Sequence, residues 1–328
     1  MEDLVTSLER ALSLHLQGRF AEAVELGQGL LGRSRGTPHA AAVHRHQAEF
    51  LLASGAIDGA RRMAQEAGTL ARASRHPDEI LAASLVVLDC DLHAGAIAAV
   101  HQQLGELCAL AAGRPEPVGA MARLMLRVGE LDGAVETAER ARGLLDESDA
   151  GPRRPLLELE RAELLLVEGR ARLLAGRPDR ALMRFERVLG EELISPLPPT
   201  RARALAGAAL VGCGREAEGR ELCTQAVAMG RKRSADLHGQ CLSAAASAHR
   251  QLGEPGLARE QLRAASALLA HPLDRQEVFF RLGDIARASG QPGEAEQALR
   301  RATDPTTETL FGRRAVRALH RLVGLRAI

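Results

Sequence analysis

Apolar positions recur along the chain with helical spacing, in segments that come in pairs around a glycine. In the first segment Leu4, Leu8 and Leu12 recur every four residues, so they line one face of a helix. Gly18 follows, and an apolar pattern of the same period resumes from Ala23. Glycine ends a helix at little cost because it readily adopts the left-handed backbone conformation. This stretch therefore predicts two helices joined by a tight turn.

The arrangement of a glycine followed five residues later by a small residue recurs eight times, at intervals of about 38 residues. The glycines are Gly18, Gly55, Gly95, Gly129, Gly176, Gly214, Gly253 and Gly290. Their partners are Ala23, Ala60, Val100, Ala134, Ala181, Gly219, Ala258 and Ala295. A fixed period of this size indicates an array of helical repeats, each packed on its neighbours. Proline can open the second helix of a repeat, and it does so in our interpretation at Pro178, Pro255 and Pro292.

Two further columns of residues are in register with these glycines. Seven residues before each glycine stand Ala11, Ala48, Leu88, Ala122, Gly169, Gly207, Ala246 and Gly283. Twelve residues after each glycine stand Leu30, Ala67, Leu107, Ala141, Val188, Ala226, Ala265 and Ala302. We expect the two helices of a repeat to cross where these columns meet, because small side chains allow the helix axes to approach closely.

These columns resemble the tetratricopeptide repeat (TPR) family, and the resemblance covers nearly the whole chain. The aromatic residue that the family has near the turn is kept only as Phe20. Repeat 3 departs from the pattern, with Leu88 and Val100 at positions that are small in the family. The period exceeds the family's 34 residues. In this it resembles the extended repeats of bacterial signalling regulators.

The resemblance implies an all-α, right-handed superhelical array of about eight helix-turn-helix repeats with a C-terminal capping helix. We expect a single solenoid over residues 1–328. Its predicted repeats cover 1–36, 37–75, 76–114, 115–150, 151–194, 195–232, 233–270 and 271–303, and the capping helix covers 304–328. Asp304 and Pro305 suit the N-cap and the first position of that helix. The two longest loops, 145–154 and 191–200, predict a hinge or a subdomain boundary.

Composition narrows the class of protein. Apolar residues make up 46% of the chain and aromatic residues only 2%, so we expect Ala and Leu to fill a folded core. The formal net charge is +1, which argues against a nucleic-acid-binding protein. The longest basic run, Arg231–Lys232–Arg233, falls in a predicted loop. Arginine takes the place of lysine almost everywhere, as expected of a GC-rich bacterial genome.

The cysteines, the hydropathy and the N-terminal residues indicate the cellular compartment of the protein. The five cysteines include no C-x-x-C pair and fit small buried thiols in a reducing compartment. No apolar run approaches the 18 or more residues of a membrane span. The N-terminal Met-Glu-Asp is acidic, unlike the basic start of a secretory signal. We therefore expect a cytoplasmic protein that does not bind a membrane.

Sequence motifs of catalysis and metal binding are absent. His44 and His46 are two residues apart, so they point to different faces of a helix. The chain has no zinc-ligand spacing, no phosphate-binding G-x-x-x-x-G-K-[ST] motif and no G-x-S-x-G elbow. We therefore predict that the chain is not an enzyme and has no catalytic residue, metal site or cofactor.

The remaining candidate site is the concave surface that the resemblance implies, which is lined by the first helix of each repeat. Projecting the family's groove positions onto this chain gives Arg45, Glu49, Asp89, His93, Arg123, Arg127, Glu163, Arg170, Arg201, Arg250, Phe280, Asp284 and Arg287. Among these groove positions, arginines outnumber acidic residues in repeats 4 to 7. Guanidinium groups suit carboxylates and phosphates. We therefore predict a partner-binding site at Arg123, Arg127, Arg170, Arg250, Arg287 and Phe280.

Two alternatives to this site remain open. The arginines can instead be solvated, or paired with Glu and Asp of neighbouring helices.

If the arginines do bind a partner, its nearby apolar anchors would be Leu126, Leu166 and Leu173. The usual Lys/Asn carboxylate clamp of some family members is excluded, because the chain has no Asn and its single Lys lies in a predicted loop.

The function that these observations predict is a non-catalytic scaffold that binds a protein or peptide, with an acidic segment as the favoured partner. One alternative is a sensor or regulatory segment of a larger bacterial signalling protein, such as a transcriptional activator or a caspase-like protease. A second alternative is small-molecule binding in the core of the superhelix. The identity of the partner and the oligomeric state do not follow from the sequence.

Overall fold

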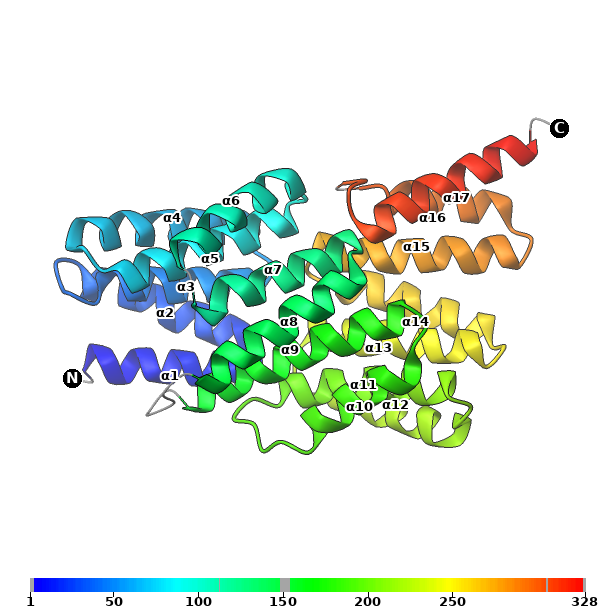
Figure 1. The fold of residues 1–328 in the computed structure, drawn as a ribbon, viewed down its shortest axis with the longest axis horizontal. Coiled ribbons are helices and arrows are strands. Elements are labelled where there is room, and N and C mark those ends of the chain that lie inside the picture. The colour runs from blue at the N-terminus through cyan, green and yellow to red at the C-terminus, as the bar shows by residue number, and fades with distance from the viewer. Residues whose placement is uncertain (1–2, 112, 148–153, 305, 327–328) are drawn as a thin grey trace. The chain divides into compact units, whose positions relative to one another are not determined.

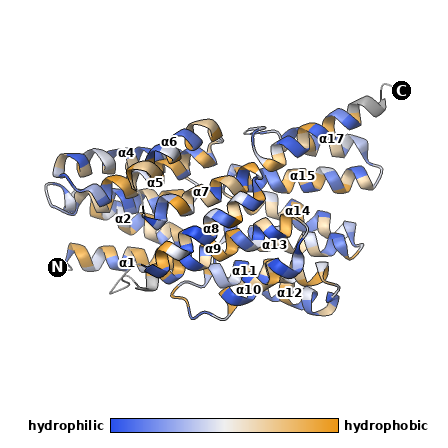
Figure 2. Cartoon of the chain, viewed as in Figure 1, coloured by the Kyte–Doolittle hydropathy of each residue, from blue (hydrophilic) through white to orange (hydrophobic). Residues whose placement is uncertain are grey.

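The described residues of the computed structural model, 3–111, 113–147, 154–304 and 306–326, form 17 α-helices and no strand (Figure 1). The helices come in consecutive pairs, with hydrophobic and hydrophilic residues interspersed along each helix (Figure 2). The predicted all-α class and the eight helical pairs followed by one more helix are confirmed.

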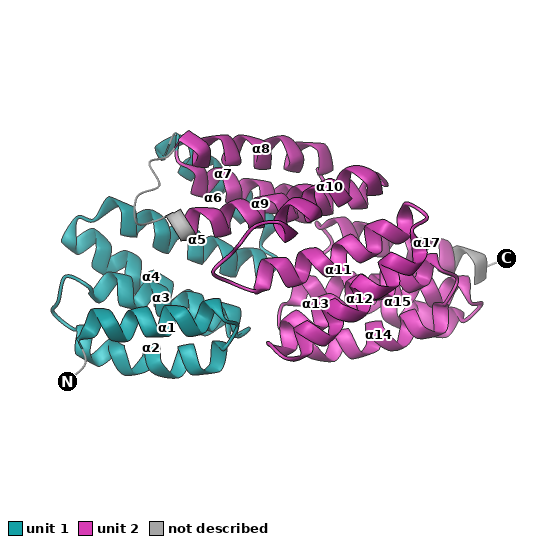
Figure 3. Cartoon of the chain, turned by 90° about the horizontal axis from the view of Figure 1, so that it is seen from below, with its two compact units in different colours: residues 1–113 teal, residues 114–328 magenta. Residues whose placement is uncertain are grey.

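The chain divides into two compact units, residues 1–113 and 114–328 (Figure 3). The first unit contains α1 (Leu4–Leu16), α2 (Phe20–Ser34), α3 (Ala40–Ala53), α4 (Ile57–Ser74), α5 (Pro77–His93) and α6 (Ile97–Leu110). The division lies in the loop between repeats 3 and 4. The predicted single solenoid and the hinges at 145–154 and 191–200 stay predictions, and residues 148–153 lie outside the described residues.

The second unit contains the other eleven helices of the described chain. They are α7 (Pro115–Val128), α8 (Leu131–Glu147), α9 (Arg154–Leu174), α10 (Pro178–Leu189), α11 (Leu197–Gly212), α12 (Glu216–Arg231), α13 (Ala235–Gln251), α14 (Pro255–Leu268), α15 (Pro272–Ala288), α16 (Pro292–Arg301) and α17 (Leu310–Arg326). In each repeat the odd-numbered helix comes first and the even-numbered helix follows it.

The eight turn glycines all have the left-handed conformation that the sequence predicts, with φ between 69° and 87°. Side chains other than glycine rarely adopt this conformation, so the glycine column is explained by backbone geometry. The predicted helix-opening prolines are also confirmed, because Pro178, Pro255 and Pro292 are the first residues of α10, α14 and α16.

Close helix crossing explains the column of small residues seven positions before each turn. A Cβ atom added at Gly207 would lie 2.6 Å from Cys223 Sγ and 2.8 Å from the carbonyl oxygen of Gly219 on the following helix. At Gly283 it would lie 2.6 Å from Leu299 Cγ. Real Cβ atoms do not approach other atoms so closely, so only glycine fits at these two crossings.

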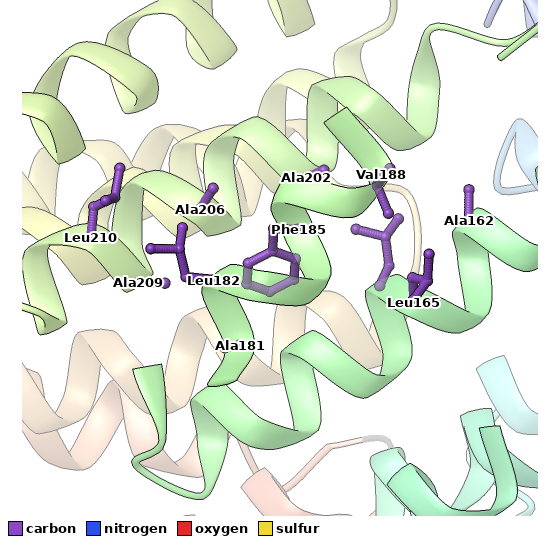
Figure 4. Packing of buried hydrophobic residues seen from close by; sticks show 11 residues of the cluster. Ala162, Leu165, Ala181, Leu182, Phe185, Val188, Ala202, Ala206, Ala209 and Leu210 are labelled. Carbon is purple, nitrogen blue, oxygen red and sulfur yellow. The ribbon is translucent and has the colours of Figure 1, made fainter. Parts of the chain in front are cut away.

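The core is a series of small clusters between neighbouring helices, most of them built from alanine and leucine. In the largest described cluster, Phe185 of α10 lies among Leu165 of α9 and Ala202 and Ala206 of α11 (Figure 4). Gly169 of α9 leaves the space that the Phe185 ring occupies, since a Cβ there would lie 2.4 Å from the ring. One of the few aromatic residues of the chain thus fills the space that a glycine leaves on the paired helix.

The last helix begins later than the sequence predicts. Helix α17 starts at Leu310, and the Thr309 hydroxyl accepts a hydrogen bond from the Gly312 amide at 3.0 Å. Thr309 therefore caps the helix, and Asp304 lies in the preceding turn. Pro305 lies outside the described residues. Because both Asp and Thr are good caps, residue type alone did not separate these two starts.

Candidate functional site

The six residues predicted to bind a partner all lie in the second unit, on the first helices of four repeats. Arg123 and Arg127 lie on α7, Arg170 on α9, Arg250 on α13, and Arg287 and Phe280 on α15. Each of the five arginines forms an ion pair with an acidic residue of the same unit. Four of these pairs join different helices, as in the alternative left open by the sequence, and Arg287 pairs within its own helix.

Two of these ion pairs join repeats that are far apart in the sequence. Arg127 of α7 contacts Asp274 of α15, with 2.6 Å between Nη1 and Oδ1. Arg170 of α9 contacts Glu277 of α15. Repeats 4 and 5 are thereby tied to repeat 8 within the second unit.

Glu277 is almost completely buried and is shared by two arginines, Arg170 and Arg281. Burial by itself would raise the pKa of Glu277, but the charges of the two arginines outweigh it and hold that pKa below its usual value. The Glu277 charge in turn raises the pKa of Arg170. Arg281 also donates to the Ser243 carbonyl oxygen at 3.0 Å, so its guanidinium is anchored to α13.

The second shared carboxylate is more open to solvent. Asp284 pairs with Arg250 of α13 at 2.5 Å and with Arg287 of its own helix at 2.9 Å. Both arginine side chains remain about half exposed, at 51% and 50%, whereas the Asp284 side chain is 17% exposed. Arg123 has a nearby partner in Glu160 of α9 at 3.1 Å. Arg250 and Arg287 are thus the most accessible of the predicted site residues.

Phe280 faces the last helix of the unit. Its ring lies 5.7 Å from the ring of Phe311 in α17, measured between centroids. It also packs against the buried cluster of Leu299, Ala302 and Ala315. Phe280 therefore belongs largely to the packing of α17 on α15 and α16.

The contact between repeat 4 and the end of the unit is closely packed. The Arg313 guanidinium of α17 donates to the Val128 carbonyl oxygen, and Leu310 packs on the turn at Gly129. The cavity between these parts measures about 10 Å³, at the lower limit of what holds a water molecule. Its walls are Leu126, Arg127, Arg170, Leu174, Leu273, Gln276, Thr309 and Phe311.

Sequence reasoning missed Asp274, Glu277 and Arg281, although it placed Asp284 in the groove. The i,i+4 spacing of Glu277 and Arg281 was the one available signal, and it predicts only a local pair. The proposed apolar anchors are also placed differently from the expectation. Leu126 and Leu166 are buried in core clusters, so neither side chain is exposed in this structure.

The first unit contains a larger cavity of about 560 Å³ beside the loop between α2 and α3. It is an open hollow, lined by Arg35, Gly36, Ala40, His44, Arg62, Gln65, Glu66, Thr69 and Leu70. His44 Nε2 lies 3.7 Å from the Glu66 carboxylate across it. None of these residues was selected from the sequence, because surface residues of helices α3 and α4 carry no motif.

The described residues contain no group of three or more His, Cys, Asp or Glu side chains placed to hold a metal ion. Among the cysteines, Cys90, Cys223 and Cys241 are buried. Burial raises the pKa of the Cys223 thiol to about 12, so it is protonated at neutral pH. No helix in the described parts of the chain is long and apolar enough to cross a membrane.

Comparison with known proteins gives a likeness in fold alone. The chain matches no protein-family model and no curated protein by sequence. It is similar to a solved chain of the APC/C hetero-tetramer Cut9–Hcn1, with a TM-score of 0.60 and 14% identity, over 97% of this chain and 55% of that chain. The chain thus spans about half the length of that relative.

Two further solved structures are Rap proteins. One, complexed with competence and sporulation factor, has a TM-score of 0.60 and 14% identity, over 87% of this chain and 85% of that chain. The apo form of RapI has a TM-score of 0.51 and 13% identity, over 82% and 78% of the two chains. These likenesses show that the chain is a TPR-like all-helical repeat protein.

Proposed function

We propose that this chain is a non-catalytic binding scaffold that takes an acidic protein or peptide segment on the arginine-bearing helices of its second unit. The fold supports the binding role, because two similar structures, the APC/C hetero-tetramer and the Rap complex, are of proteins held with a partner. The charges of the site support the acidic partner. The extended-period bacterial type and the cytoplasmic location remain part of this proposal.

The observation that carries the proposal is the sharing of carboxylates. Arg250 and Arg287 share Asp284, and Arg170 and Arg281 share Glu277. One guanidinium of each pair can therefore turn to an incoming carboxylate while the other still neutralises the internal acid. A partner thus gains a charge-assisted hydrogen bond without leaving a partly buried carboxylate unpaired. Arg250 and Arg287 are the more exposed arginines, so we expect them to make the first contacts with the partner.

Binding of a fluorescent Glu- and Leu-rich peptide to the full chain, followed by anisotropy, tests this proposal. We expect the double change Arg250→Gln and Arg287→Gln to weaken binding by about tenfold or more, the value of one lost charged contact. We expect weaker binding at higher salt, since exposed charges are screened. Arg231→Gln, at the last residue of α12, is the control and should leave the affinity unchanged. Equal loss in both variants, or binding that ignores salt, would refute the site.

The alternative of a regulatory segment in a larger signalling protein uses the same binding surface. It differs in requiring an effector domain elsewhere. Identification of an effector fused to this array, or encoded beside it, would favour that alternative.

A further inference from the structure

Helix α15 presents an acidic, amphipathic turn to the two helices that carry Arg127 and Arg170. Leu273, Asp274 and Glu277 occupy positions i, i+1 and i+4 of this helix. Asp274 pairs with Arg127 and Glu277 pairs with Arg170, while Leu273 lines the narrow cavity between them. One turn of α15 therefore supplies two carboxylates and one leucine to the same contact.

The opposing face on α7 and α9 has the complementary chemistry. Leu126 and Arg127 come from the last turn of α7, and Arg170 and Leu174 come from the last two turns of α9. We call these four residues the receiving face. Two guanidinium groups beside two leucines match an acidic turn with a leucine, and such a combination of charge and apolar contact characterises helix-in-groove recognition.

The contact is held at its edges by α17. Leu310 packs on the Gly129 turn, and Arg313 donates to the Val128 carbonyl oxygen. The Gln276 side chain of α15 donates to the Thr306 carbonyl oxygen at 2.6 Å and accepts a hydrogen bond from Thr309. These contacts keep α15 on the receiving face, and they lie outside it.

We propose that the receiving face is the docking site for an acidic partner helix with the pattern Leu-Asp-x-x-Glu, and that α15 is its resident occupant. This inference rests on the proposed function and names the kind of segment that the second unit binds. A partner helix displaces α15 from Arg127 and Arg170. Arg250 and Arg287 attract the segment first, because they are exposed while α15 is in place.

Competition between the resident and the partner has a measurable consequence. The resident is part of the same chain, so its effective concentration at the receiving face is far higher than that of a free peptide. A free helix of the same sequence therefore binds the wild-type protein poorly, and it binds better when the resident contact is weakened.

The test uses a fluorescent peptide with the sequence of residues 272–288 and the full chain. In the variant Asp274→Asn with Glu277→Gln, we expect the peptide to bind at least about tenfold more tightly than it binds the wild type. Adding Arg127→Gln and Arg170→Gln to that variant should abolish the gain. A peptide carrying the two amide changes itself should bind none of the proteins well.

A further variant, tested beside a matched control, weakens the closure without changing any charge. Gly129→Ala moves a methyl group against Leu310, since a Cβ at this glycine would lie 2.8 Å from Leu310 Cδ1. Gly176→Ala imposes the same left-handed strain at a turn where a Cβ meets nothing within 4 Å. We expect Gly129→Ala to raise the peptide affinity and Gly176→Ala to leave it unchanged.

Equal peptide affinity in the wild type and in both weakened variants, with helical circular dichroism retained, would overturn the inference. So would equally tight binding of the amide peptide, which would show that the two carboxylates are not recognised. The proposed function fails by a different result, namely unchanged binding of the Glu- and Leu-rich peptide in the Arg250→Gln and Arg287→Gln variant.

Discussion

Glycine serves two different purposes in this chain, and single residues distinguish them. At Gly207 the close approach of two helices excludes any side chain, because a Cβ would meet the backbone of Gly219. At Gly143, on the exposed side of α8, a Cβ would meet nothing within 4 Å. The first glycine is required by packing, and the second is merely tolerated in a helix.

Gly207→Ala should therefore lower the free energy of unfolding by about 1–3 kcal/mol, as overpacking does. Alanine's better helix propensity returns at most about 1 kcal/mol, so the clash prevails. The matched change Gly143→Ala should raise stability by up to about 1 kcal/mol. Urea unfolding of both variants checks the difference. A Gly207→Ala protein as stable as Gly143→Ala would mean that α11 and α12 do not cross there.

His15 couples the stability of the first unit to pH. Its ring packs against Phe20 and Phe50, at 5.5 Å and 5.3 Å between centroids, and its Nδ1 has no hydrogen-bond partner among the described residues. Burial lowers the pKa of His15. The charge of Glu49 opposes this shift, and the charge of His46 adds to it. The unfolded chain therefore binds a proton at a higher pH than the folded chain does.

The ordinary pKa of a histidine side chain is 6.5. As the pH falls below this value, protonation of His15 in the unfolded chain lowers the free energy of unfolding. This loss continues until the pH reaches the lowered pKa of His15 in the folded chain. His15→Phe keeps the ring and removes this titration. The melting temperature of the wild type should fall more than that of His15→Phe between about pH 7.5 and pH 5.5. Parallel melting curves for the two proteins would show that His15 makes no contribution.

At the scale of helices, the sequence predicted the repeats well and the contacts of their polar residues poorly. The turn glycines and the small residues were predictable because local backbone geometry and close packing restrict those positions to few residue types. The start of α17 was missed, since Asp304 and Thr309 are both suitable caps and only the surrounding structure selects Thr309. The burial of Glu168, a residue of α9, was also missed, because nothing in the surrounding sequence indicates it.

Glu168 of α9 joins three helices through two arginines. Its carboxylate is fully buried and contacts Arg142 of α8 at 2.5 Å and Arg184 of α10 at 2.7 Å. Glu168→Ala leaves two guanidinium groups without this partner and should cost about 3 kcal/mol or more. Glu218→Ala removes an exposed pair with Arg215 and should cost far less, because solvent screens such pairs. Similar losses in chemical unfolding of the two variants would contradict this role of Glu168.

At the scale of the whole molecule, the candidate site was predictable as a set of arginines but not as a set of pairs. Helix periodicity placed Arg127, Arg170 and Arg250 on the first helices of their repeats. Their partners Asp274, Glu277 and Asp284 lie between 34 and 147 residues away along the chain, by subtraction of residue numbers. The stacking of repeats within the second unit decides such pairings, and it depends on many small packing angles that no local pattern encodes.

The central claim is that an acidic segment binds the second unit at the helices that carry these arginines. Amide hydrogen exchange of the full chain, with and without the Glu- and Leu-rich peptide, tests it most directly because it reports each helix separately. We predict that the peptide changes exchange in α7, α9, α13 and α15 and leaves α3 and α4 unchanged. Changes confined to the first unit, beside the cavity at Arg35 and Arg62, would contradict the account.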